Sequence, residues 1–306
     1  MEKPIKIKKK KNWMEISFIL FCVALPVLNW LVFYVYTNLS SFLMAFTKVD
    51  GTLTLEHFTR LFQEFQIASS DIRTALKNTL LTFGLLVLSY PFKVLVSFFI
   101  YKKVPFAGIY RILFFLPSII FGVAIAMIFN RMVSPNGFIA ETVQNLFHLD
   151  YVPELLSDSR FANATVLLHM LWLGFPGDLI IWGGTFARIP GEMLEAGRID
   201  GVNWWTEFTK IVVPMVWPTV SLQIVMMACG VFGASGAVFL LTRGEYGTTT
   251  LSCWTYLQVL NVAGTAETSN AFHYLSAVGF VMTVIAIIIS LSVRKVADSY
   301  FEEVEF

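Results

Sequence analysis

Two ionisable side chains, Lys93 and Asp178, lie well inside long apolar stretches of the sequence. Charged groups within a membrane-spanning segment are costly and commonly serve a substrate pathway, an ion pathway or a proton relay. Lys93 has a long side chain that can reach the membrane surface, and we favour this interpretation over a functional role. Asp178 has a short side chain. We therefore expect its carboxylate to face a polar cavity inside a helix bundle, within reach of Lys93.

Other residues that could perform chemistry are scattered. The three cysteines, Cys22, Cys229 and Cys253, and the four histidines show no spacing typical of a disulfide framework or a metal site, so no bound metal is expected. His169 lies within an apolar stretch and could be functional, but we expect a hydrogen-bonded packing histidine. The sequence contains no Gly-x-x-x-x-Gly-Lys-Ser/Thr phosphate-binding loop. ATP hydrolysis is therefore not expected in this chain.

The elements that must position these residues are membrane spans. Of the 306 residues, 56% are hydrophobic and only 14% are charged, and the mean hydropathy is +0.68. Soluble domains carry roughly a quarter charged residues, and a helix needs about 20 apolar residues to cross a bilayer. We predict an all-α integral membrane protein, a single membrane domain over residues 1–306, with six transmembrane helices. The spans lie near 14–36, 78–100, 110–130, 163–187, 211–241 and 271–293, and the long fifth one is expected to tilt or break.

Orientation follows from the basic residues, which are retained on the cytoplasmic side. With the N-terminus inside, 14 of the 22 Lys and Arg fall in inner segments, seven fall in outer segments, and Lys93 falls within a span. Both termini and residues 188–210 are thus predicted to be cytoplasmic. The first apolar stretch follows a basic run, as in a signal peptide. Because it is long and contains Pro26 and Asn29, we interpret it as an uncleaved helix.

Two outer segments carry amphipathic patterns. Apolar residues at helical spacing over 55–65 predict a helix lying on the outer membrane surface or packed on neighbouring spans. The turn sequence Ser134-Pro135-Asn136-Gly137 precedes a second predicted helix at 138–148.

The inner segment 188–210 has its own start and stop signals. Pro190 can occupy the first turn of a helix, and Glu195 lies early enough to favour its positive end. Ala196 and Gly197 leave a bare patch that another backbone can approach. Asp200-Gly201 ends the helix, because glycine accepts positive φ. Asn203 can cap a second short helix, which carries Trp204, Trp205 and Phe208 as an interfacial anchor before Pro214 begins the fifth span.

This segment resembles the EAA loop of ABC importer permeases, which reads Glu-Ala-Ala, three residues later Asp-Gly, and about a dozen later an aliphatic-x-x-Pro. The resemblance implies that the segment couples the permease to an ATPase. The matching positions are Glu195, Ala196, Gly197, Asp200, Gly201, Phe208, Ile211 and Pro214. Gly197 departs from the usual Ala, which should soften the helix by roughly 1 kcal/mol.

The resemblance covers nearly the whole chain. The chain is most similar to the carbohydrate branch of the family, where a Leu-Glu-Asn-Phe helix precedes Asn-Thr-Leu. Here His57 replaces the Asn of that helix, and Asn78-Thr79-Leu80 follows. Gly244-Glu245-Tyr246 departs from the usual Thr-x-Gly-Gly-Pro. The family implies the type I importer fold in a bacterial cytoplasmic membrane. It also implies a second homologous permease, two ATPase subunits that bind ATP and Mg, and an extracytoplasmic binding protein that delivers a sugar. No cofactor is expected on this chain.

Two stretches are candidates for the substrate pathway. In the fourth span, Gly174-Phe175-Pro176-Gly177 predicts a helix break before Asp178, and broken helices at membrane depth line cavities or are buried in protein. In the fifth, Gly230, Gly233 and Gly236 form a small-residue stripe that serves either close packing or the pathway. Aromatic and hydrogen-bonding side chains suited to sugars complete the set: Asn78, Asn130, Trp172, Asp178, Gln223 and Ser235.

Alternatives within and outside this family stay open. A permease for a non-sugar solute such as glycerol-phosphate, a peptide or an amino acid is one alternative. Amino-acid, peptide and metal permeases share the loop but usually lack the Leu-Glu-x-Phe helix. An ion-coupled secondary transporter would show inverted repeats, of which no convincing example is found, and would leave the loop unexplained. A membrane sensor or scaffold would normally add a soluble domain.

Overall fold

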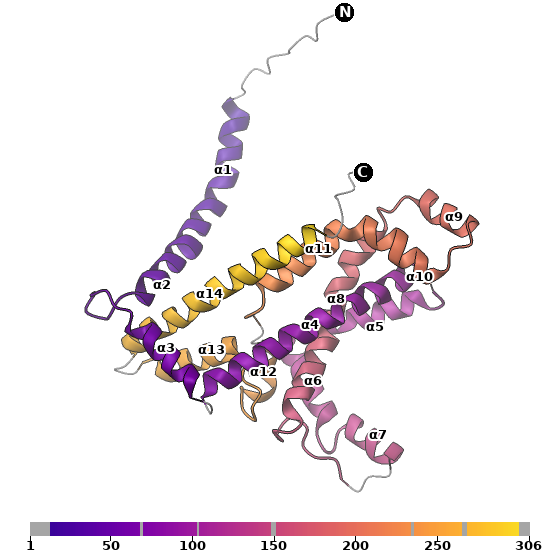
Figure 1. Cartoon of the computed structure of the whole chain (residues 1–306). Coiled ribbons are helices and arrows are strands. Elements are labelled where there is room, and N and C mark those ends of the chain that lie inside the picture. The colour runs from indigo at the N-terminus through magenta and orange to yellow at the C-terminus, as the bar shows by residue number, and fades with distance from the viewer. Residues whose placement is uncertain are drawn as a thin grey trace, which may run out of the picture.

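The computed structural model describes residues 13–67, 70–102, 104–147, 151–233, 236–264 and 268–299, and its regular elements there are helices (Figure 1). Within those ranges six apolar helical stretches are long enough to cross a membrane, which confirms the predicted all-α fold with six spans. The helices are α1 (Trp13–Asn29), η1 (Trp30–Tyr36), α2 (Thr37–Ala45), α3 (Glu56–Gln66), α4 (Asp71–Tyr101), α5 (Ala107–Ile119), α6 (Gly122–Val133), α7 (Phe138–Phe147), α8 (Ala162–Phe186), α9 (Gly191–Ile199), α10 (Trp204–Thr206), η2 (Glu207–Val212), α11 (Val213–Cys229), α12 (Gly236–Thr242), α13 (Leu251–Val262) and α14 (Thr268–Asp298), where η marks a π-helix.

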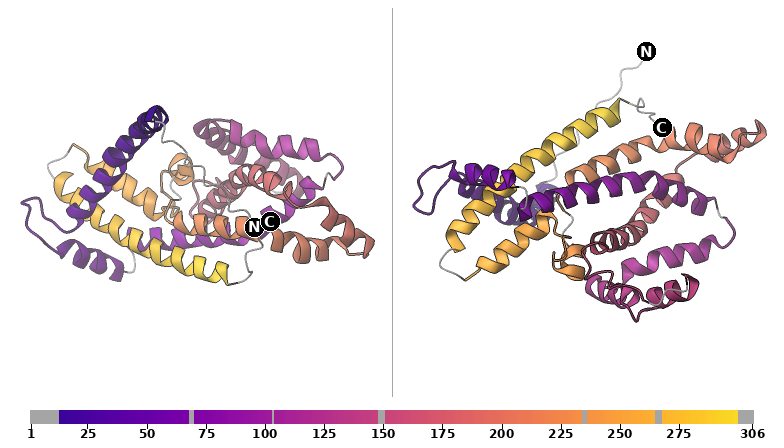
Figure 2. Two further views of the ribbon diagram at one scale, coloured as in Figure 1. Left: turned by 90° about the horizontal axis from the view of Figure 1, so that it is seen from above. Right: turned by 60° about the horizontal axis from the view of Figure 1, so that its bottom comes forward.

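The long helices pack in two groups that share α11. Helix α4 lies against α8, and α5 covers another side of α8, whereas α14 lies against α11, α2 and α13 (Figure 2). Apolar side chains of α4, α8, η2 and α11 form one buried cluster, and those of α3, α4, α13 and α14 form a second. The 31-residue helix α4 therefore contributes to both clusters.

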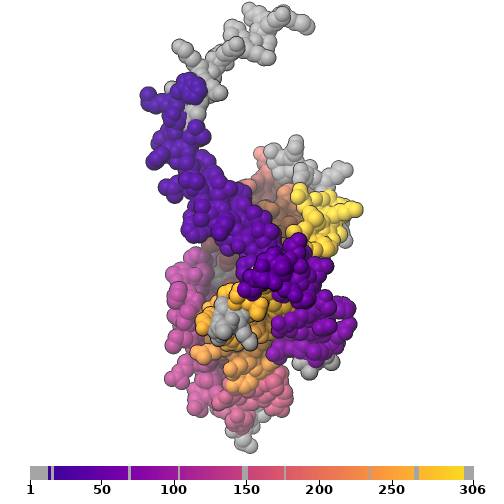
Figure 3. Space-filling model, turned by 90° about the vertical axis from the view of Figure 1, so that its left-hand side faces the viewer, coloured from indigo at the N-terminus to yellow at the C-terminus, as the bar shows by residue number. Residues whose placement is uncertain are grey.

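The first span is longer than predicted. Its apolar stretch runs over Ser17–Ala45 rather than 14–36, because the helix passes Pro26 and continues through η1 into α2. Helix α1 projects away from the other helices (Figure 3). Its apolar side chains are exposed, as Phe21 (77%) and Leu25 (73%) illustrate. Such a surface suits lipid or another membrane helix.

The third span contains a break that was not predicted, and the fourth span lacks a break that was. The prediction of one continuous helix at 110–130 is wrong, because Ile120 and Phe121 are not helical and separate α5 from α6. The membrane-length stretch instead begins at Gly122. The break expected at 174–177 is also wrong, since α8 is helical from Ala162 to Phe186. The side chain of Lys93 contacts this turn from α4, as described below, and ties it to the bundle.

The fifth span, predicted at 211–241, breaks as expected, and the break lies inside the predicted range. Helix α11 stops at Cys229 and α12 resumes at Gly236. At its other end the helix runs continuously from Trp204, so Pro214 does not begin a new helix. Pro214 follows the π-helix η2, where the hydrogen-bond spacing changes and a residue without an N–H is tolerated.

Two outer helices are confirmed and one element was missed. Helices α3 and α7 match the amphipathic segments predicted at 55–65 and 138–148. Helix α13 was not predicted. In Figure 1 the start of α1, the end of α14 and α9 lie toward one end of the bundle, and α3, α7 and α13 lie toward the other. This sidedness agrees with the predicted topology, although the direction across a membrane stays a prediction.

Candidate functional site

The segment after α8 forms a helical hairpin whose turn has the predicted chemistry. Helix α9 ends at Asp200, and Gly201 adopts a φ of +70°, which L-residues rarely adopt. Asn203 then caps the next helix, since its side-chain oxygen accepts a hydrogen bond from the backbone N–H of Thr206 at 2.8 Å. Pro190 lies one position before α9, as its N-cap. The turn and the cap predicted for 190–203 are confirmed.

Gly197 packs against this chain rather than presenting a bare patch to another one. It is buried, and a Cβ built on it would lie 2.9 Å from the terminal methyl of Ile211 in η2. The N–H of Val202 also donates to the Gly197 carbonyl at 3.0 Å. The exposed face of α9 carries Glu195, Ala196 and the apolar Ile199, which is 86% exposed. That face, without Gly197, is the surface available to a partner.

The hairpin is fixed to the bundle through η2. Phe208 is buried, with its ring centroid 5.2 Å from that of Phe98 in α4. Next to it, Glu207 forms an ion pair with Lys102 at the end of α4. The sequence pattern does not distinguish Glu207, because an isolated Glu in a mixed-polarity loop resembles any solvated one. Only its burial beside Phe208 distinguishes it.

Lys93 and Asp178 form a buried ion pair between α4 and α8. Lys93 Nζ lies 3.0 Å from Asp178 Oδ2 and donates a hydrogen bond to the Gly174 carbonyl at 3.0 Å. Contact between the two residues is therefore confirmed, while the interpretation that Lys93 extends to the membrane surface is wrong, because the residue is 5% exposed. A side chain at Gly174 would collide with this ammonium, 2.8 Å from the built Cβ.

His169 is packed but not hydrogen-bonded, contrary to expectation. It is 1% exposed, and among the described residues neither ring nitrogen has a hydrogen-bond partner. Its ring lies edge-on to Phe129 at 4.7 Å and near Trp172 at 6.3 Å. Trp172 is half-buried within this aromatic cluster, so its indole faces protein on at least one side.

Asn78 has structural partners for its whole amide group. Its nitrogen donates to the carbonyls of Gly247 and Thr249 at 2.7 and 2.9 Å, and its oxygen accepts from Asn163 at 3.1 Å. The neighbouring Thr79 hydroxyl accepts from the N–H of Leu251 at 2.9 Å. The Asn-Thr pair thus holds the loop before α13. This amide has little capacity left for a sugar.

The remaining pathway candidates are spread out. Asn130 is exposed near the end of α6, and Gln223 is half-buried in α11. Ser235 lies outside the described residues. The structure therefore brings together Asp178 and Lys93, but it does not gather the five described candidates into one site.

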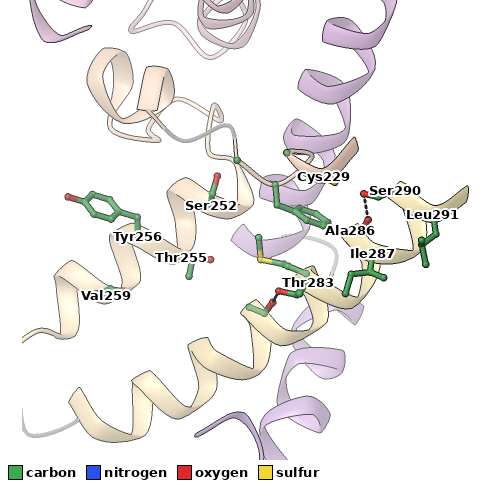
Figure 4. A pocket seen from close by; sticks show the side chains of 15 residues that line it. Cys229, Ser252, Thr255, Tyr256, Val259, Thr283, Ala286, Ile287, Ser290 and Leu291 are labelled. Atoms are coloured by element: carbon green, nitrogen blue, oxygen red, sulfur yellow. Dashed lines mark hydrogen bonds between the residues drawn. The ribbon is translucent and has the colours of Figure 1, made fainter. Parts of the chain in front are cut away.

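A cavity of about 860 Å³ lies where α11 ends, between α13 and α14 (Figure 4). Gly230 and Gly233, two of the three glycines of the small-residue stripe, line it. Its walls are mainly apolar. The polar groups in them are mostly hydroxyls, from the residues Ser252, Thr255, Tyr256, Thr283 and Ser290. The buried Ser252 hydroxyl has no hydrogen-bond partner among the described residues.

No family model matches the chain. Relatives among known proteins match this chain over most of their own length. The chain is 25% identical over 285 residues to the arabinooligosaccharides transport system permease protein AraP of Bacillus subtilis, which covers 90% of this chain and 86% of that protein. It is 23% identical over 280 residues to the lactose transport system permease protein LacF of Rhizobium radiobacter, covering 90% and 88%. It is 25% identical over 267 residues to a probable ABC transporter permease protein of Pyrococcus horikoshii, covering 85% and 88%.

Solved structures share the fold. A chain in the crystal structure of a bacterial ABC transporter involved in the import of the acidic polysaccharide alginate superposes with a TM-score of 0.79 at 22% identity, covering 95% of this chain and 99% of that one. A second structure, of a bacterial alginate ABC transporter in complex with an alginate pentasaccharide-bound periplasmic protein, gives a TM-score of 0.77, with coverage of 94% and 99%.

Proposed function

We propose that this chain forms one membrane half of a sugar importer. The premise is that it is a homologue of ABC transporter permease subunits and has the ABC importer permease fold. The observation that carries the proposal is the hairpin formed by α9 and the helix beginning at Trp204. Its inner side is fastened to α4 and α11, and its outer side carries exposed charged and apolar residues at one end of the bundle. A segment built in this way suits a moving partner.

The partner is an ATPase in a separate chain. That ATPase binds ATP and Mg. Its docking surface is the exposed face of α9, which includes Glu195, Ala196 and Ile199. Gly197, Asp200 and Gly201 set the shape of the hairpin, and Phe208, Ile211 and Pro214 connect it to the bundle. The proposal places this surface and both termini in the cytoplasm.

The substrate is a sugar or an oligosaccharide. Relatives named for arabinooligosaccharides and lactose, and a neighbour solved with an alginate-bound periplasmic protein, support this class and a binding protein as deliverer. A second homologous permease would complete the pathway in a bacterial cytoplasmic membrane. The cavity between α11, α13 and α14 is our candidate for this chain's share of it, because hydroxyl groups suit a sugar and apolar walls suit its ring faces.

Transport assays test the proposal. The chain is reconstituted in lipid vesicles with the permease, ATPase and binding-protein partners encoded beside it, and uptake of labelled arabinotriose, lactose, maltotriose and an alginate trisaccharide is measured. Uptake of at least one sugar should need both ATP and the binding protein. Uptake that persists without ATP and collapses with the proton or sodium gradient would instead identify a secondary transporter.

A further inference from the structure

Glu207 and Lys102 form a second buried ion pair, at the base of the α9 hairpin. Lys102 Nζ lies 2.5 Å from Glu207 Oε2, and the two side chains are 23% and 5% exposed. The other carboxylate oxygen, Oε1, is buried and has no hydrogen-bond partner among the described residues. Among the described residues the whole carboxylate therefore relies on Lys102, through Oε2, which makes the pair sensitive to any separation of the two helices.

The surroundings of this pair are aromatic. Lys102 Nζ lies 5.3 Å from the ring centroid of Phe98, and that ring contacts Phe208 of η2 and Phe186 of α8. Phe99 contacts Trp204 at 5.3 Å. An apolar environment strengthens the attraction between opposite charges and makes an unpaired charge costly. The pair and the rings thus fix η2 to the end of α4.

Helix α4 connects this end to the centre of the bundle. It runs without interruption from Asp71 to Tyr101, with Lys93 inside it and Lys102 as its C-cap. The hairpin already continues covalently into α11. Without the Lys102–Glu207 pair, a displacement of the hairpin would act directly on α11, and the uncharged packing contacts of the shared cluster would transmit it to α4.

We propose that Lys102 and Glu207 are positioning residues for energy coupling, and that they make α4 follow the hairpin when the ATPase moves it. The proposal rests on the proposed function and adds a second route, through α4, to the one through α11. Neither Lys102 nor Glu207 is among the residues that match the EAA loop.

The test uses the complete transporter in lipid vesicles. Three variants of the pair are compared: Glu207→Gln, Lys102→Met and the double variant, which leaves no unpaired charge and therefore restores complex yield. Glu56→Gln is the matched control, because Glu56 forms an exposed Lys–Glu ion pair with Lys48 at 2.8 Å. For each variant we measure ATP hydrolysed per molecule imported, using whichever of the four named sugars the wild type takes up.

A positioning role predicts that this ratio rises by roughly fivefold or more in all three pair variants, the lower end of typical coupling between sites, and stays at the wild-type value in Glu56→Gln. A merely structural role predicts a lower yield in the single variants with an unchanged ratio. A double variant with normal yield and a normal ratio would overturn the proposal.

A distance measurement separates this proposal from the proposed function. Spin labels replace Leu88 on α4 and Lys210 on η2, both exposed, in a cysteine-free background. With ATP and vanadate as the probe, the distance between the labels should stay constant in the wild type and change in the double variant. A constant distance in both would sink the coupling role of the pair, whereas absent sugar uptake by the wild type would count only against the proposed function.

Discussion

Lys93 Nζ contacts α8 at two points one helical turn apart, the Asp178 carboxylate and the Gly174 carbonyl, both at 3.0 Å. One buried cation thus spans the part of α8 whose sequence, Gly-Phe-Pro-Gly, is weakest as a helix. The two contacts account for an unbroken α8 and for an aspartate at membrane depth, since each charge offsets the burial of the other.

Replacing Asp178 with Ala should impair transport or complex yield. The variant leaves Lys93 buried and unpaired, and breaking one partner of such a pair costs about 3–5 kcal/mol. Removing the charge of Lys93 as well, in Asp178→Ala with Lys93→Met, should restore part of the loss. Complex yield in detergent and sugar uptake are measured together. An Asp178→Ala transporter that is normal in both would show that the pair is a tolerated feature.

Replacing Gly201 with Leu should uncouple transport while membrane insertion stays normal. The φ of +70° at this turn costs a residue with a side chain roughly 1–2 kcal/mol, so the hairpin changes shape. Gly108→Ala is the control, because its built Cβ meets nothing within 4 Å and its φ is not positive. ATP hydrolysis and uptake are assayed in parallel. Full uptake with Leu at 201 argues against a role for the turn.

Restoring the family's alanine at 197 should require a change at Ile211. The added Cβ would lie 2.9 Å from the Ile211 terminal methyl, which offsets the gain of roughly 1 kcal/mol from replacing Gly in a helix. Gly197→Ala combined with Ile211→Val, which lacks that methyl, should have a higher melting temperature than Gly197→Ala alone. Equal melting temperatures would mean that the Ile211 side chain moves aside freely.

Cys229 offers a test of the pathway because it is a native thiol in the cavity wall. It is exposed and lines the cavity between α11, α13 and α14 (Figure 4). Cys22, by contrast, is exposed on α1. A bulky thiol reagent should block uptake in the wild type and in Cys22→Ser, but not in Cys229→Ser. An imported sugar in excess should slow the reaction at Cys229. Undiminished uptake by fully modified Cys229 would move the pathway elsewhere.

Topology is tested by single cysteines in a background free of native ones. Cysteine at Asn203 should resist a membrane-impermeant thiol reagent in intact cells, while cysteines at Gln66 and Glu245 should react. The reason is the excess of basic residues on the predicted inner side. The reverse labelling pattern would place the α9 hairpin outside, away from any cytoplasmic ATPase.

The sequence by itself determined the features that depend on local physics. Apolar segments long enough to cross a bilayer predict helices wherever they occur, and Gly201 and Asn203 specify a turn and a cap through their own backbone preferences. The amphipathic helices α3 and α7 follow from periodicity in the same way.

Tertiary structure decided what depends on partners distant in sequence. The Gly-Phe-Pro-Gly stretch stays helical because Lys93 reaches it from α4, and Asn78 holds the loop before α13 because that loop returns beside it. Glu207 gained importance only when folding buried it against Lys102. The physical reason is common to all three: the stability of a polar group inside a bundle is set by the group that faces it, and neither spacing nor composition identifies that group.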